Sequence, residues 1–63
     1  MVLGINANGV KITGIEYGGL IDKVFVQFPG SNEEYMVDLN YNGDEAFFII
    51  GDELYSLNDF VKV

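Results

Sequence analysis

The chain has 63 residues, a formal net charge of −7, and neither cysteine nor histidine. So short a chain forms one domain, 1–63, without disulfides, and its charge repels nucleic acid and anionic membranes. Because the side chains that usually titrate near neutral pH are missing, and arginine with them, we expect no enzyme, no cofactor and no metal site.

Residues that favour tight turns punctuate the chain at regular intervals. These turn signals are Asn8-Gly9, Gly18-Gly19, Pro29-Gly30, Asn42-Gly43 and Gly51-Asp52. Between them lie short segments rich in Val, Ile, Phe and Tyr, which are typical of strands. Most segments between the turn signals are shorter than an ordinary helix, which disfavours helix. The sequence therefore predicts an all-β protein built from consecutive hairpins.

The first expected hairpin turns at Asn8-Gly9. A two-residue loop there places Ile5 opposite Ile12. The apolar residues then change parity between Ile12 and Ile15, and the intervening Gly14 predicts a β-bulge that switches faces. The next apolar stripe is expected in the strand over 24–28.

Three further neighbouring strands are expected to form a meander, over 35–41, 44–50 and 53–57. Asn42-Gly43 and Gly51-Asp52 serve as its two-residue loops. The first loop places Val37 opposite Phe48, and the second places Phe48 opposite Tyr55. All three side chains then lie on one face, and a slip of one residue would move one strand's apolar set to the other face.

The last stretch, 56–60, predicts a single 3₁₀ turn before a short strand over 61–63. A 3₁₀ turn followed by a short closing strand resembles the SH3-like small barrels, and the resemblance covers roughly residues 10–63. Curling into a barrel also removes open sheet edges. The expected fold is therefore an antiparallel meander of five to six strands, curled into an SH3-like small barrel.

One segment has the opening pattern of a calcium-binding loop, namely Asp38-Leu39-Asn40-Tyr41-Asn42-Gly43. The twelfth position of such a loop should be a bidentate glutamate, but here it is Ile49. The flanking segments are typical of strands rather than helices. We therefore interpret Asn42-Gly43 as a hairpin turn.

The second face of the meander is expected to be apolar, whereas a sheet open to water should be polar there. On this face lie Met36, Phe47, Ile49, Leu54 and, if the meander continues, Phe25. Two interpretations are open. The face is either covered within the monomer, or it is an exposed surface for partner binding or self-association.

Alternate turns of a meander lie at opposite ends, so the acidic residues should gather in two groups. One end is expected to hold Glu33, Glu34, Asp52 and Glu53, and the other Asp22, Asp44 and Glu45. These acids either keep the protein soluble or complement a basic partner surface. In the sharpest form of the second interpretation they mimic nucleic acid and block a DNA- or RNA-binding protein.

Together these features predict a non-catalytic, acidic protein-binding module. The acidic ends would steer it to a basic partner and the apolar face would hold it. Its size and charge resemble the accessory or inhibitor proteins of phages and mobile elements. The alternative is a structural homo-oligomer, with the apolar face joining a homodimer. We expect a cytoplasmic protein, because no apolar run is long enough to span a bilayer and the start lacks the basic residues of a signal peptide.

Overall fold

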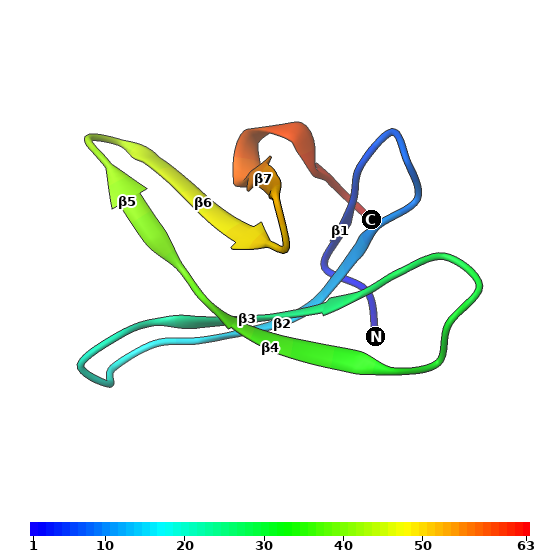
Figure 1. Ribbon diagram of the computed structural model, residues 1–63, viewed down its shortest axis with the longest axis horizontal. Coiled ribbons are helices and arrows are strands. Elements are labelled where there is room, and N and C mark those ends of the chain that lie inside the picture. Colours follow the sequence, from blue (N-terminus) through cyan, green and yellow to red (C-terminus); the bar gives the residue numbers. More distant parts are fainter.

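The computed structural model describes all residues, 1–63, and shows two antiparallel sheets that face each other (Figure 1). Sheet A has five strands in the order β4 (Glu34–Asp38), β3 (Lys23–Gln27), β2 (Lys11–Glu16), β1 (Gly4–Ile5) and β8 (Val61–Lys62). Sheet B has three strands in the order β5 (Asn40–Asn42), β6 (Glu45–Ile50) and β7 (Glu53–Ser56). The prediction of an all-β antiparallel fold is confirmed. No strand pairing closes the two sheets into a barrel.

A 3₁₀ helix, η1 (Leu57–Asp59), connects β7 of sheet B to β8 of sheet A. The side chain of Ser56 caps it, because the Ser56 hydroxyl accepts the backbone N–H of Asn58 at 3.2 Å. The predicted 3₁₀ turn and short final strand are therefore confirmed.

The predicted strand 35–41 is divided, because the chain leaves sheet A and enters sheet B at Leu39. β4 pairs with β3, whereas β5 pairs with β6. Leu39 is buried, and its backbone N–H donates to the carbonyl oxygen of Asp22 at 2.8 Å. This corner joins the two sheets on one side of the core, and η1 joins them on the other.

The core lies between the two sheets. It is formed by buried side chains of both, namely Ile12, Val24, Val26, Leu39 and Phe48. The Phe48 ring stacks on Tyr55 with centroids 5.1 Å apart and lies 5.9 Å from the ring of Phe60. Val37 packs against the same cluster from sheet A, where it pairs with Val24. Both side chains face the core, but the predicted pairing of Val37 with Phe48 is wrong.

The predicted register of β6 and β7 is confirmed. Phe48 pairs with Tyr55, and Ile50 pairs with Glu53 across the two-residue loop Gly51-Asp52. Gly51 has a φ of 63°, and this conformation suits the first loop position of a type II′ turn.

The register of β5 and β6 differs from the prediction by two residues. Asn42 pairs with Glu45, so the loop is Gly43-Asp44 rather than Asn42-Gly43. Gly43, with a φ of 64°, takes the first loop position rather than the second. A shift of two residues keeps every side chain on its predicted face, because strand side chains alternate with a period of two.

β1 and β2 pair one residue out of the predicted register. Ile5 pairs with Lys11 instead of Ile12. Against β3, the register of β2 shifts between Ile12 and Gly14, which confirms the predicted bulge. The bulge allows Ile12 and Ile15, three residues apart, to face the same core.

The loop between β1 and β2 explains the shifted register. The Asn6 side-chain oxygen accepts the backbone N–H groups of Asn8 at 3.0 Å and Val10 at 2.9 Å. These bonds close a loop of three residues instead of two, and its last residue, Gly9, has a φ of 84°. A three-residue loop that ends in a left-handed glycine is a common alternative to the two-residue hairpin.

Candidate protein-binding surface

Sheet B carries exposed apolar side chains on the face that points away from the core. Ile49 and Leu54 lie opposite each other on β6 and β7 and are 50% and 59% exposed. Phe47 shares their face and is half-buried. Phe48, between Phe47 and Ile49, is fully buried, as alternation along a strand requires. We call Phe47, Ile49 and Leu54 the sheet B patch.

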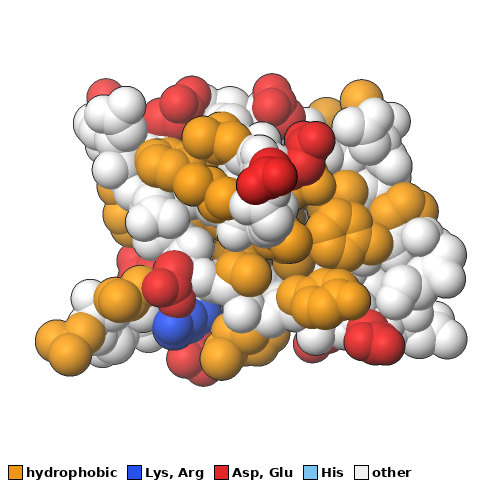
Figure 2. All heavy atoms as spheres, viewed as in Figure 1, with side chains coloured by type: hydrophobic (Ala, Val, Ile, Leu, Met, Phe, Trp, Pro, Cys, Tyr) orange, Lys and Arg blue, Asp and Glu red, His pale blue; other side chains and the backbone are white.

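The charges near the sheet B patch are all of one sign. The segment 39–60 contains no lysine, and its acids are Asp44, Glu45, Asp52, Glu53 and Asp59. All of these acids are exposed. Figure 2 shows acidic side chains beside hydrophobic ones over the upper layer, whereas the lysine visible in this view lies over the lower layer. The lysines, Lys11, Lys23 and Lys62, all belong to strands of sheet A.

The structure divides the predicted apolar face between the two sheets. Met36 pairs with Phe25 across β4 and β3, so the prediction that Met36 shares one sheet face with Ile49 is wrong. The reason is the corner at Leu39, which moves the chain out of sheet A before it reaches β6. Because the inner faces of the sheets pack on each other, the outer face with Met36 points away from the sheet B patch.

The outer face of sheet A carries charges of both signs. Lys23 and Asp38 form the single ion pair of the structure. The hydroxyl of Thr13 donates to the Glu34 carboxylate at 2.8 Å. Phe25 is half-buried and covers Gly14, where an added Cβ would lie 3.3 Å from the Phe25 ring. Sheet A is therefore the less suitable of the two faces for a partner of one charge sign.

The four acids predicted at one end of the molecule are exposed but come from both sheets. Glu33 and Glu34 lie at the start of β4, and the Glu33 N–H donates to the hydroxyl of Ser31 at 3.1 Å. Asp52 and Glu53 lie at the turn between β6 and β7.

An aromatic contact joins the sheets at this end. The ring of Phe28 meets Tyr35 of β4 with centroids 5.7 Å apart and Tyr55 of β7 with centroids 6.3 Å apart. Glu34 directly precedes Tyr35, and Glu53 lies two residues before Tyr55. Each pair of acids therefore lies at the start of a strand that supplies one of these rings.

The opposite end is formed by the β2–β3 connection and the β5–β6 turn (Figure 1). There the Asp22 carboxylate accepts the phenolic O–H of Tyr41 at 2.6 Å. This hydrogen bond raises the pKa of Tyr41 to about 12, with smaller contributions from desolvation and from the negative charge of Asp22. The Glu45 carboxylate accepts the side-chain amide of Asn58 at 3.4 Å.

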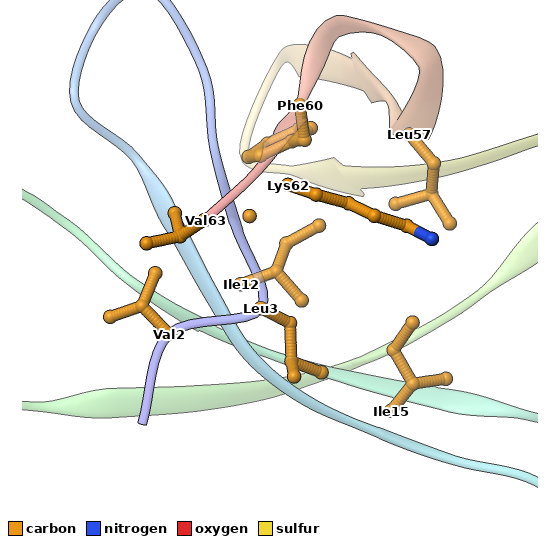
Figure 3. A pocket seen from close by; sticks show the side chains of 9 residues that line it. Val2, Leu3, Ile12, Ile15, Leu57, Phe60, Lys62 and Val63 are labelled. Atoms are coloured by element: carbon orange, nitrogen blue, oxygen red, sulfur yellow. The ribbon is translucent and has the colours of Figure 1, made fainter.

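An apolar cavity of about 440 Å³ opens between the two chain ends and η1. Its walls include Ile12 and Ile15 of β2, together with Leu57 and Phe60 around η1 (Figure 3). Lys62 is the one charged residue that lines it. The Lys62 side chain extends along the cavity, and its ammonium group ends on the side of Leu57 and Ile15 (Figure 3). Sequence reasoning missed this cavity, because it depends on how the chain ends pack.

The segment that resembles a calcium-binding loop is used for strand pairing. Asp38 forms its ion pair with Lys23, while Asn40 and Asn42 belong to β5. No three Asp or Glu side chains come close enough together to hold a metal ion. The structure has one helical element, η1 with three residues, and no helix capable of crossing a bilayer.

Comparison of the chain with protein-family models, with curated proteins and with solved structures gave no match. A proposal for its function therefore has to follow from the chemistry of its own surfaces.

Proposed function

We propose that the protein is a non-catalytic protein-binding module that docks a basic partner surface on the outer face of sheet B. One observation carries the proposal. The exposed apolar side chains of Ile49 and Leu54 lie in a part of the chain, 39–60, that holds five acids and no lysine.

An apolar centre with a polar rim is the usual anatomy of a protein–protein interface. The sheet B patch supplies the apolar centre, and Asp52, Glu53 and Glu45 supply charge near its border. Rim charges mainly accelerate and orient the encounter, whereas buried apolar contacts slow dissociation. The acids at Glu33 and Glu34 extend the negative surface beyond sheet B.

The same charges disfavour a homodimer joined through sheet B. Such a dimer would bring together two copies of the segment 39–60, each with five acids and no lysine, and like charges near an interface oppose association. A nucleic-acid mimic is a special case of the proposal, in which the partner's basic surface is itself a binding site for phosphates. An inhibitor or accessory protein of a phage or mobile element would act in this way.

The proposal includes an SH3-like arrangement of the two sheets. It is supported by the strand that bends at Leu39 to serve both sheets and by the 3₁₀ turn η1 before β8. In such an arrangement the outer face of sheet B is free to bind while the inner face holds the core.

Two matched variants test the proposal. Leu54 and Met36 are 59% and 58% exposed, on the outer faces of sheets B and A respectively, and each pairs with an apolar neighbour. Leu54→Asp should weaken binding of a captured partner about tenfold or more. Met36→Asp should leave binding unchanged. The measurement is the Kd of the partner, captured from host lysate and then purified, with circular dichroism to confirm that both variants fold.

Salt supplies a second arm of the experiment. Rim charges are screened at high ionic strength, so capture should weaken between ~0.05 M and ~0.5 M salt. Capture that is insensitive to salt, or equal loss of binding in both variants, would contradict docking on sheet B.

A further inference from the structure

We propose that the protein self-associates head to tail, with Leu20 and Ile21 of one copy inserted into the apolar cavity of the next copy. The inference is independent of the partner site on sheet B. It combines two features of the chain, a protruding apolar loop and an apolar cavity, that lie in different parts of the molecule (Figure 1).

The connection between β2 and β3 carries two adjacent aliphatic side chains that are exposed to solvent. Leu20 is fully exposed and Ile21 is half-exposed. Figure 2 shows hydrophobic side chains projecting at the left, where Figure 1 places this connection. A single exposed leucine is common, but two adjacent exposed aliphatic residues on a projecting loop form an apolar surface that an apolar pocket can bury.

The base of this loop is held in place. The carbonyl oxygen of Asp22 accepts the backbone N–H of Leu39 at 2.8 Å, and its carboxylate accepts the Tyr41 hydroxyl at 2.6 Å. The next residue, Lys23, forms the ion pair with Asp38. Because these contacts fix the loop before binding, less conformational entropy is lost when its tip is buried.

The cavity has the size and lining to receive such a tip. Its volume of about 440 Å³ falls in the range of about 300–1,000 Å³ that is usual for ligand pockets. None of its lining residues belongs to the β2–β3 loop, which extends away from it (Figures 1 and 3). A β2–β3 loop that enters the cavity must therefore belong to another copy.

Charge complementarity favours a second copy as that molecule. Lys62 is the one charged side chain in the cavity lining, and it forms no ion pair. The connection 17–22 carries Asp22 and no basic residue. Glu16 ends β2 opposite Lys23, whose charge is paired with Asp38. Insertion of the loop brings Asp22 toward the unpaired ammonium of Lys62. A basic partner, as proposed for sheet B, would instead be repelled there.

The loop and the cavity form a heterologous contact, in which each copy keeps one free loop and one free cavity. Such a contact builds open chains, or a ring if the rotation closes, rather than a dimer with twofold symmetry. Since the contact is small and each copy carries a charge of −7, association should be weak. We expect it only as the protein concentration approaches ~1 mM.

Sedimentation velocity of the full chain, from ~0.05 to ~1 mM, tests the assembly. The weight-average mass of the wild type should rise with concentration and pass the dimer mass. Leu20→Asp removes the apolar tip, and Lys62→Glu reverses the cavity charge, both at exposed positions. Each variant alone should stay monomeric, whereas Met36→Asp should behave as the wild type.

A mixture of the two variants gives the decisive result. The Lys62→Glu copy keeps an intact loop and the Leu20→Asp copy keeps an intact cavity, so the mixture should form dimers that grow no further. A wild type that stays monomeric at ~1 mM, or whose mass stops at the dimer, would overturn the proposal. So would a mixture that behaves as the separate variants do. Partner capture by Leu20→Asp should remain normal, which separates this contact from the sheet B patch.

Discussion

Replacing Phe48 by alanine should remove most of the protein's stability. Phe48 is 0% exposed, and its ring contacts Tyr55 and Phe60. Removing a buried phenylalanine side chain costs about 3–5 kcal/mol. The whole chain of 63 residues, at about 0.05–0.15 kcal/mol per residue, has a free energy of unfolding of about 3–9 kcal/mol. We therefore expect a large fraction of Phe48→Ala molecules to be unfolded at room temperature.

Urea denaturation followed by far-ultraviolet circular dichroism measures this effect. The control is Ile49→Ala, one residue away on the same strand, where the side chain is 50% exposed on the outer face. Its expected cost is about 1 kcal/mol, because truncation there removes less buried apolar surface. If the two variants unfold at the same urea concentration, then β6 does not turn Phe48 inward and Ile49 outward, and the reasoning fails.

Three further predictions concern single contacts. Asp22→Ala should return the pKa of Tyr41 from about 12 toward the ordinary value of 10.0. The neutral phenol of Tyr41 is favoured in the folded state. Its stabilising effect is therefore present below pH 10 and is lost as the pH rises toward 12. Ultraviolet titration of the phenolate in both proteins measures the pKa of Tyr41, and an unchanged pKa in Asp22→Ala would contradict the prediction. Asn6→Ala should lower the free energy of unfolding in urea by about 1–2 kcal/mol, because two backbone N–H groups lose their acceptor. Gly43→Ala should lower the free energy of unfolding, measured by thermal denaturation, by about 1 kcal/mol, because the φ of Gly43 is 64°. Gly19→Ala changes a position without positive φ and should lower this free energy less.

The strands could be predicted because turn chemistry and side-chain alternation agree along most of the chain. The loop at Gly51-Asp52 fixes the register of β6 and β7 as expected. The neighbouring loop was predicted wrongly, because Asn-Gly is a strong turn signal and favours Asn42-Gly43 as the two loop residues. Yet both loops share the tripeptide Gly-Asp-Glu, at 43–45 and 51–53. Treating the two tripeptides alike, with glycine first in the loop, gives the observed register.

The first hairpin shows how a side chain overrides a backbone preference. Asn8-Gly9 favours a loop of two residues, but the Asn6 side chain binds two backbone N–H groups and enlarges the loop to three. Asparagine side chains often form such local hydrogen bonds with the backbone, so Asn6 is the residue in the sequence that indicates the longer loop.

The candidate site could be predicted only in part. Alternation along β6 correctly places Phe47 and Ile49 on the outer face, and pairing with β7 adds Leu54. It does not reveal that Met36 belongs to the other sheet, because that depends on the corner at Leu39. The corner is set by packing between distant parts of the chain, and no local pattern marks it. The cavity depends in the same way on contacts between the two chain ends and η1.

The segment 39–60 holds five acids and no lysine, whereas the rest of the chain holds five acids and all three lysines. The formal charges of −5 and −2 on these two parts give the protein an electric dipole. In the field of a cationic body such a dipole rotates during diffusion, before any atoms touch. At physiological salt this alignment acts only within about 8 Å, the distance over which charges are screened. The molecule would thus reach a cationic surface with sheet B already facing that surface, so that a larger fraction of its encounters would lead to binding.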